Sequence, residues 1–357
     1  MSTALRAEVE FTRPAEFGDR YVWNPAADDV RLARACIDLK AGLHRAAGEV
    51  LAESRGAAGP GSGAGQGSGS RSGSRSGLVD SALRAHRSLV LAAAAADSDT
   101  AEQWAARDPG PDALLLLART AAARALRAAD RGDWRAARLA EIAAAGCERA
   151  AVAAPGDPVP LVVKLSLARL STAPDTASAC EHGRAAARAA LLDAAHDLFR
   201  QITEIDPGNR EAHHRLLALH FARHGGSAAE MWQAAWWIAD RVAQDSELAL
   251  LPFVALAEDA RERPAESGPW ADPDWRRAAV AVYRSWFPRV AREYRFTPVV
   301  DLSCLGHALA MARLSEARHV LGAMGPFATT VPWDLHGNPV AALTEARRRL
   351  GLRVPVL

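Results

Sequence analysis

Turns that begin α-helices recur along this chain and constrain its fold more than any other feature. Asp157-Pro158 and Asp272-Pro273 each place an N-cap acceptor before a proline, and Asp112 also follows a proline. A capping aspartate with proline at the first helical position is typical of a helix start. Alanine, leucine, arginine and glutamate follow these starts, while the β-branched and aromatic residues that favour strands are sparse. The chain is therefore predicted to be all-α.

The same signals set the expected helix boundaries. Ser227-Ala-Ala-Glu230 is a capping box, and Gly225-Gly226 before it would end the preceding helix. Helices are expected near residues 26–55, 79–96, 112–130, 133–153, 158–171, 176–204, 209–224, 228–244, 246–261, 273–294, 299–312, 315–323 and 339–350. Most connections have two to five residues, which predicts that neighbouring helices run antiparallel.

A segment of nearly pure glycine and serine, Gly56 to Gly77, interrupts the helical pattern. It has nothing to bury, so ordering it would cost backbone entropy without return. We interpret residues 56–77 as a disordered linker. It separates an N-terminal arm and helix, residues 1–55, from a helical-repeat domain, residues 78–352.

Charge, hydropathy and cysteine spacing exclude several classes of protein. The 43 Lys and Arg residues balance 42 Asp and Glu residues, so the net charge of +1 argues against a dedicated nucleic-acid binder. No stretch reaches the roughly 18 apolar residues of a membrane span, so no membrane partner is expected. The four cysteines form no CxxC pair. The cytoplasm, where thiols stay reduced, is the predicted location.

The motifs of common enzyme classes are missing from the sequence. It has no HExxH, GxSxG or GxGxxG motif and no phosphate-binding loop with its lysine. A non-catalytic role is therefore favoured over an enzyme, and no cofactor is expected.

One histidine cluster keeps a metal site open. His213, His220 and His224 would share one face of a continuous helix, with Glu211 or Glu230 nearby. Imidazole and carboxylate groups in this pattern are ligands for a divalent metal. Packing of these histidines between helices, with His224 capping a helix end, is favoured over a metal site.

The segment MWQAAWWIAD contains the second candidate site. Trp232 and Trp236 are four residues apart and would lie on one helix face, while Trp237 would point elsewhere. In an alanine-rich protein, tryptophans fill the space that small neighbours leave. The alternative is that these three tryptophans line a groove that binds a peptide or protein partner.

The spacing of small and aromatic residues resembles the tetratricopeptide-like superfamily. Gly183, Ala195, Phe199 and Pro207 match the pattern of a small residue, an aromatic residue and a closing proline. Partial copies are Ala143, Ala150 and Pro155, with Cys147 at the aromatic position, and Leu305-Gly306 followed by Glu316-Ala317. The resemblance implies an irregular α-solenoid of antiparallel helix pairs, which would bind a partner on its concave face.

A narrower resemblance covers residues 102–260. Aspartate-proline turns and a Gly-Gly-Ser turn before an aromatic helix are similar to those of a bacterial domain of helical pairs. That resemblance implies no particular activity.

These observations lead to one main interpretation and two alternatives. The main one is a non-catalytic helical scaffold that binds a protein or peptide. The first alternative is a metal-binding protein or enzyme centred on the histidines of residues 213–224. The second is a helical subunit that forms a homo-oligomer through its tryptophan-rich face.

Overall fold

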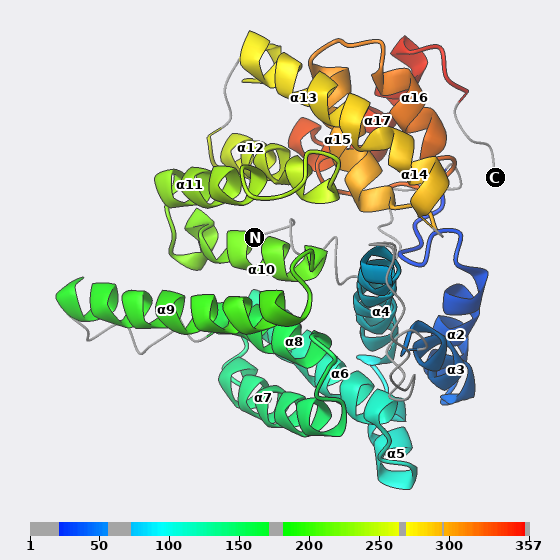
Figure 1. Cartoon of the computed structure of the whole chain (residues 1–357), viewed down its shortest axis with the longest axis vertical. Coiled ribbons are helices and arrows are strands. Elements are labelled where there is room, and N and C mark those ends of the chain that lie inside the picture. Colours follow the sequence, from blue (N-terminus) through cyan, green and yellow to red (C-terminus); the bar gives the residue numbers. More distant parts are fainter. Residues whose placement is uncertain (1–20, 56–72, 171–180, 264–268, 295, 354–357) are drawn as a thin grey trace, which may run out of the picture. The chain divides into compact units, whose positions relative to one another are not determined.

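The computed structural model describes residues 21–55, 73–170, 181–263, 269–294 and 296–353. Within these ranges the chain is all-α, as predicted, and the pairing of Val22 with Phe327 is an isolated β-bridge (Figure 1). The predicted linker, residues 56–77, lies outside the described residues up to residue 72, and helix α4 begins at Gly73. No described helix combines the length and the apolar character that a bilayer crossing demands.

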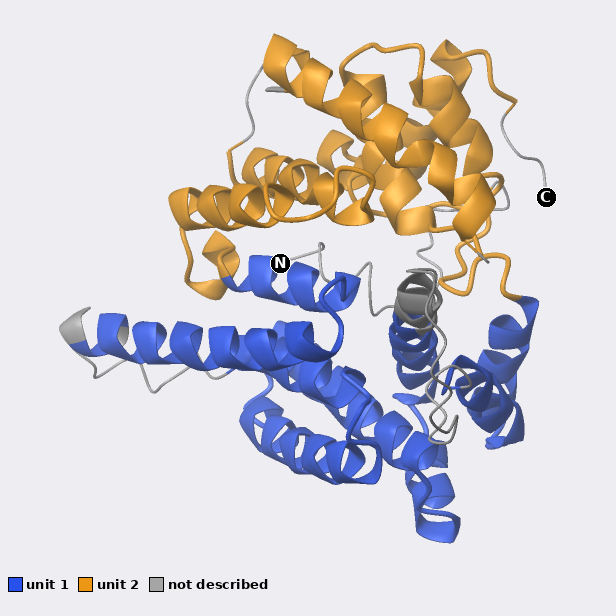
Figure 2. Cartoon of the chain, viewed as in Figure 1, with its two compact units in different colours: residues 1, 30–219 blue, residues 2–29, 220–357 orange. Residues whose placement is uncertain are grey.

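The helices divide into two compact units (Figure 2). Unit 1 covers Val30–Leu219. Its α-helices are α2 (Val30–Lys40), α3 (Arg45–Arg55), α4 (Gly73–Ala95), α5 (Thr100–Arg107), α6 (Pro111–Asp130), α7 (Ala136–Ala153), α8 (Val159–Leu167), α9 (Glu181–Ile205) and α10 (Arg210–Leu219), and the 3-10 helix η2 (Ala168–Leu170) follows α8.

Unit 2 combines Ser2–Asp29 with His220–Leu357. Its α-helices are α11 (Ala228–Ala239), α12 (Leu251–Glu262), α13 (Pro273–Ser285), α14 (Phe287–Glu293), α15 (Val299–Met311), α16 (Ala317–Ala323) and α17 (Pro339–Arg349). Its 3-10 helices are η3 (Ala222–His224), η4 (Glu247–Leu250), η5 (Pro269–Ala271) and η6 (Trp333–His336). The chain thus divides after Leu219, and α2 and α3 belong to the same unit as α4–α10.

Small residues set the packing of unit 1. Ala118 and Ala122 of α6 lie buried against Ala143 and Cys147 of α7. At Gly146, an added methyl group would lie 3.3 Å from the Cα atom of Ala118. The close approach of α6 and α7 therefore depends on residues that have little or no side chain.

Aromatic residues fill the core of unit 2. Trp286 and Trp333 are fully buried together with Phe253 and Leu305. Tyr21 joins this core because the neighbouring backbone pairs with the segment after α16: Val22 N–H donates to Pro326 O at 2.9 Å. The residues before α2 are thus part of the second unit.

Local helix signals predicted most starts correctly. The Ser227–Glu230 capping box is present at α11, and Asp272 accepts a hydrogen bond from the Asp274 backbone N–H at 2.7 Å. The assignment of Asp112 as an N-cap was wrong, because α6 begins at Pro111 and its N-cap is Gly110.

The two glycines before α11 have different functions. Gly225 adopts a left-handed conformation with φ +81°, which ends η3. Gly226 has no room for a side chain, because a methyl group there would lie 2.1 Å from the carbonyl oxygen of His220. The Gly-Gly pair therefore fixes the sharp turn into α11.

Three predicted helices are interrupted. The expected helix at 26–55 is two helices, α2 and α3, with Gly42 at φ +83° between them. The expected helix at 273–294 breaks into α13 and α14, since Pro288 cannot donate the backbone hydrogen bond that would continue α13. The expected helix at 209–224 ends at Leu219. Helix α5 was not predicted.

Candidate interaction surface

The early end of α10 changes the arrangement of the candidate histidines. His213 is on α10, but His220 and His224 follow the end of that helix, so the three do not share one helical face. His213 is buried, with Nδ1 2.8 Å from the Asn209 carbonyl oxygen and its ring edge-on to Phe199. In the described ranges, no group of three or more His, Cys, Asp or Glu side chains is arranged to hold a metal ion.

The tryptophans of α11 form an aromatic cluster with a residue from α13. The rings of Trp232 and Trp236 lie 5.4 and 5.7 Å from the ring of Trp275, and Trp236 stacks on it with an angle of 26° between the planes. Phe253 of α12 contacts Trp275 edge-on at 5.7 Å. As predicted, Trp232 and Trp236 lie on one face of their helix, and Trp275 is the residue that they both contact.

The helical period of α11 explains why this cluster lies at the surface. Met231, Ala235 and Ile238 are spaced by four and three residues and make up the buried face of the helix. Trp236 and Trp237 lie beside that face and are 43% and 41% exposed. The Arg241 guanidinium lies 4.6 Å from the Trp237 ring, which is a cation–π distance. We call Trp232, Trp236, Trp237 and Trp275 the tryptophan surface.

Exposed tryptophans of this kind are unusual on a folded protein. An indole ring buries a large apolar area when a partner covers it, and tryptophan is enriched among the residues that dominate binding energy. The stacking on Trp275 holds Trp236 in place before any partner arrives. Covering the tryptophan surface with an apolar group would therefore cost little side-chain entropy.

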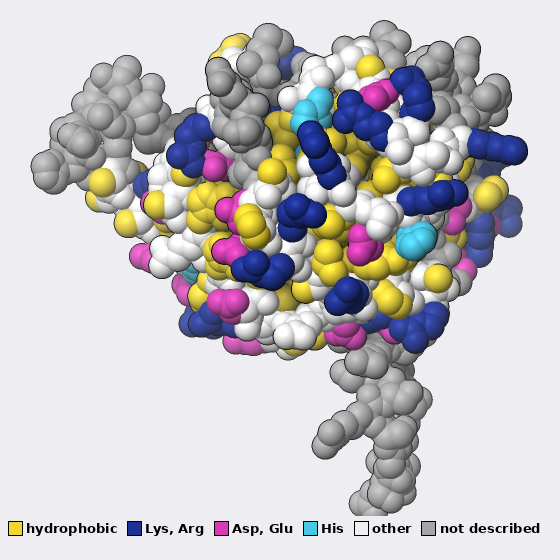
Figure 3. Space-filling view, turned by 90° about the horizontal axis from the view of Figure 1, so that it is seen from above, with side chains coloured by type: hydrophobic (Ala, Val, Ile, Leu, Met, Phe, Trp, Pro, Cys, Tyr) yellow, Lys and Arg dark blue, Asp and Glu magenta, His cyan; other side chains and the backbone are white. Residues whose placement is uncertain are grey.

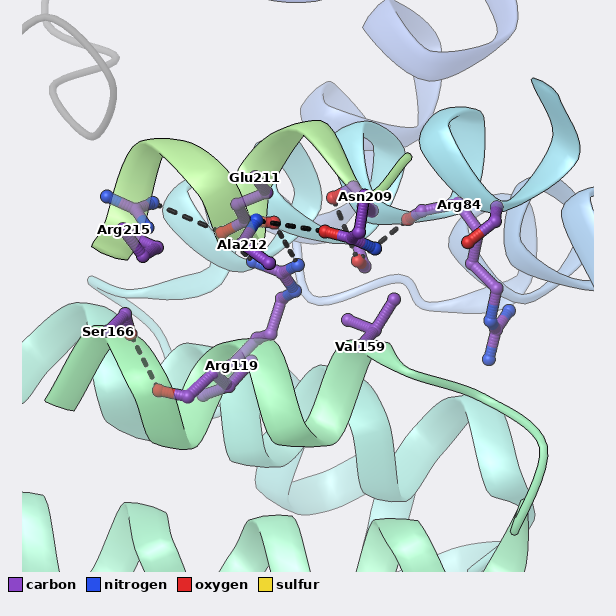
Figure 4. Close-up of polar contacts among 12 residues, drawn as sticks. Arg84, Arg119, Val159, Ser166, Asn209, Glu211, Ala212 and Arg215 are labelled. Carbon is purple, nitrogen blue, oxygen red and sulfur yellow. Dashed lines mark hydrogen bonds and ion pairs between the residues drawn. The ribbon is translucent and has the colours of Figure 1, made fainter. Parts of the chain in front are cut away.

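Unit 1 contains a network of buried charged side chains, part of which is shown in Figure 4. Arg119 of α6 makes two hydrogen bonds to Glu211 of α10, at 3.0 and 2.5 Å, and Arg215 adds a third at 3.2 Å. Burial alone would raise the pKa of Glu211, but the charges of Arg119 and Arg215 lower it to about 2. Glu211 is therefore a fixed anion that holds α6 and α10 together and has no proton to exchange near neutral pH.

Helix α4 contributes the rest of this network. Arg84 donates to Asp112 at 3.0 Å and to Asp157 at 2.6 Å, so it connects the first turn of α6 with the residues just before α8. Ser81 donates to Asp206 at 2.7 Å, just before α10. Helix α4 thus contacts residues at the starts of three helices, α6, α8 and α10, so these charges have a structural function.

A histidine pair in unit 2 was not predicted from the sequence. The Nε2 atoms of His307 on α15 and His336 on η6 lie 2.9 Å apart. His307 is fully buried between Trp270 and Trp333, whose ring centroids lie 4.8 and 5.0 Å from it. Burial lowers the pKa of His307 well below its usual value, and the neighbouring His336 adds to the effect. Both rings are neutral at pH 7, so one donates a hydrogen bond to the other.

Three cysteines of the described residues are buried and form no disulfide bond: Cys36, Cys147 and Cys304. Burial raises the pKa of Cys147 to about 12, so its reactive thiolate is rare at neutral pH. The described residues hence offer the tryptophan surface as the strongest candidate for function.

Comparisons with known proteins found no protein similar to this chain. No protein-family model, no curated protein and no solved structure matches this chain.

Sequence reasoning identified Trp232, Trp236 and Trp237 but missed their partner. Trp275 lies in the first turn of α13, two residues after Pro273. Its local sequence therefore indicates only packing near the start of a helix. Nothing local indicates that α13 packs beside α11. The pairing of His307 with His336 was missed for the same reason, because it joins two elements separated by α16 and a loop.

Proposed function

We propose that this chain is a non-catalytic, cytoplasmic scaffold that binds a protein or peptide through the tryptophan surface. The observation that carries the proposal is the stacked pair of Trp236 and Trp275, with Trp236 43% exposed. A partner that covers this pair with an apolar side chain would bury indole area that is now in contact with water.

A tetratricopeptide-like architecture of helix pairs is the second part of the proposal. It is supported by close contacts at the small residues that carry the resemblance. A methyl group at Gly306 would lie 2.5 Å from Leu321 Cδ2, so α15 and α16 approach closely there. Ala195 and Phe199 are buried against α10. Irregular repeats of this kind would present the tryptophan surface on a rigid support.

The test compares binding by two variants that each remove exposed tryptophan. Trp236→Ser with Trp237→Ser alters the tryptophan surface, and Trp134→Ser removes an indole that is 87% exposed in unit 1. Affinity capture from the native cell lysate, with quantitative mass spectrometry, should enrich a protein with the wild type and with W134S. The W236S/W237S variant should lose that protein while keeping its far-UV circular dichroism.

Two results would count against the proposal. Equal enrichment by the wild type and W236S/W237S would mean that the tryptophan surface binds nothing. A mass that grows with concentration in light scattering, and that returns to the monomer in W236S/W237S, would identify self-association as the use of this surface.

A further inference from the structure

The buried arginines of this protein differ in whether a carboxylate neutralises their charge. Within the described ranges, five arginines are almost fully buried: Arg84, Arg87, Arg119, Arg215 and Arg347. The first four each form an ion pair with a carboxylate, from Asp112, Asp157, Glu53 or Glu211. Arg347 of α17 is the exception.

Arg347 is a buried cation without an anion. It is only 4% exposed, and its Nε and Nη1 atoms have no hydrogen-bond partner among the described residues. The guanidinium cannot lose its proton at physiological pH, and an unpaired buried charge destabilises the fold. The buried arginines of unit 1 show how this protein normally meets that cost, namely with a carboxylate.

The surroundings of Arg347 are aromatic and hydroxylic. Its guanidinium carbon lies 5.9 Å from the centre of the Tyr21 ring. The Tyr21 hydroxyl lies 3.2 Å from Thr344 Oγ1, one turn before Arg347 on α17. These neighbours offer hydroxyl donors and an aromatic face, but they supply no negative charge.

A surface hollow adjoins this position. It has a volume of about 430 Å³ and is lined by Asn338, Val340, Ala341, Thr344, Glu345 and Arg348. Val340 and Thr344 precede Arg347 by seven and three residues, so they lie on the same side of α17 as Arg347. Arg347 itself does not line the hollow, but Thr344 does, and the buried Tyr21 contacts both Thr344 and Arg347.

Several arginines lie on the outer surface of unit 2. Exposed arginines lie on three of its helices: Arg276 and Arg284 on α13, Arg318 on α16, and Arg348 and Arg349 on α17. Lys and Arg side chains are scattered between apolar areas on the face shown in Figure 3. Arg348 and Arg349 both pair with Glu345 on α17, so Arg347 is the arginine of this helix that lacks a carboxylate partner.

We propose that Arg347 is the cation of a carboxylate-binding site at the α17 hollow. The ligand displaces the contact between Tyr21 and Thr344 and takes two hydrogen bonds from the guanidinium, in the bidentate geometry that suits arginine and carboxylate. A single buried cation matches the single charge of a carboxylate better than a phosphate dianion. The carboxylate belongs to a small organic acid or to a glutamate or aspartate side chain of a peptide. This site uses different residues from the tryptophan surface and stands independently of it.

The experiment measures the melting temperature of the full chain with three anions at equal ionic strength. Propionate represents a free acid, N-acetyl-glutamate amide represents an acidic side chain, and inorganic phosphate represents a dianion. Sodium chloride is the reference. The wild type should show a saturable rise of about 2–4 °C with one or both carboxylates. The carboxylate that acts at the lower concentration identifies the source.

Two variants on α17 decide whether Arg347 is responsible. Arg347→Met keeps the length of the side chain and removes the charge. In chloride alone its melting temperature should equal or exceed that of the wild type, and the rise with carboxylate should disappear. Arg349→Met removes an exposed arginine that pairs with Glu345 on the same helix, and it should respond like the wild type.

Three results would overturn the proposal. They are a lower melting temperature of R347M in chloride, an equal carboxylate response in R347M and wild type, and a rise caused by phosphate alone. Arg347→Lys is a second variant that tests the geometry of the site, because lysine keeps the charge but lacks the planar fork. Its affinity for the carboxylate should fall at least about tenfold.

Discussion

Unit 1 and unit 2 are both helical, but they fill their interiors with different side chains. Eight of the ten tryptophans belong to unit 2, and only Trp104 and Trp134 belong to unit 1. The core of unit 1 around α6 and α7 consists mainly of alanine. The core of unit 2 contains Trp286 and Trp333, both fully buried.

The difference shows two ways of holding helices together. Alanine allows helices to approach closely but buries little apolar area, so unit 1 relies on buried ion pairs such as Arg84 with Asp112 to fix which helix ends meet. Tryptophan buries a large area and tolerates wider spacing. The buried arginines of the described part of unit 1 are all paired with carboxylates, whereas the buried Arg347 of unit 2 is not.

The largest loss of stability should come from replacing Trp286 in unit 2. Trp286→Ala removes a fully buried ring and its hydrogen bond from Nε1 to Tyr294, at 3.0 Å. The free energy of unfolding should fall by about 3–5 kcal/mol, as for large-to-small changes in other cores. Urea denaturation measures this loss, and hydrogen exchange should place it in unit 2. Trp134→Ala is the matched control in unit 1, and it should change stability by less than about 0.5 kcal/mol.

The next largest loss of stability should come from breaking a buried ion pair in unit 1. Arg84→Met leaves Asp157 buried without a cation, while Asp112 keeps its ion pair with Arg55 at 2.8 Å. We expect a loss of about 3 kcal/mol, at the low end for a broken buried pair. Arg138→Met, which breaks an exposed pair with Glu141, should cost under about 0.5 kcal/mol. Equal stability of R84M and R138M in urea would show that unit 1 does not depend on its ions.

Local signals explain how much of the fold the sequence predicted. The capping box at Ser227 and the Asp272-Pro273 start involve neighbouring residues only, so they were predicted and confirmed. The interruption at Gly42 was missed because a glycine inside an alanine-rich helix costs only about 1 kcal/mol, and tertiary packing decides whether the helix continues. The end of α10 at Leu219 was missed because the residues that follow, His220 and Phe221, give no local stop signal.

The candidate sites were predictable only where they lie within one helix. Trp232 and Trp236 share a face because they are four residues apart, and the structure agrees. Arg347 lies in a run of three arginines that is typical of a solvated helix end. Its burial depends on Tyr21, from the opposite end of the sequence, and no local pattern reports such a contact.

A smaller loss of stability should come from enlarging a glycine where two helices pack closely in unit 2. Gly306→Val in unit 2 would place branched carbons against Leu321, where even a methyl group would lie 2.5 Å from Cδ2. Overpacking of this kind should cost about 1–3 kcal/mol in urea denaturation. Gly322→Ala on α16 is the control, because its added methyl group would meet only Leu352 Cδ2 at 3.9 Å. A neutral G306V variant would mean that close approach of helices matters in unit 1 alone.

The smallest effect is the pH dependence that the histidine pair gives to unit 2. Burial lowers the pKa of both His307 and His336 below the usual 6.5. Below pH 6.5 the unfolded chain therefore binds protons that the folded chain does not, so stability falls as the pH falls. Each histidine contributes at most about 1.4 kcal/mol per pH unit. Between pH 7.5 and 5.5, hydrogen exchange in α15 and η6 should accelerate.

His307→Phe separates this contribution from that of other groups. Phenylalanine keeps an aromatic ring between Trp270 and Trp333 but has no proton to gain. His214 of unit 1 also has a lowered pKa, mainly because of burial, so unit 1 retains its own pH dependence in this variant. The acid sensitivity of α15 and η6 should decrease in H307F while that of α10 stays the same. An unchanged sensitivity in α15 would contradict the assignment of the effect to His307.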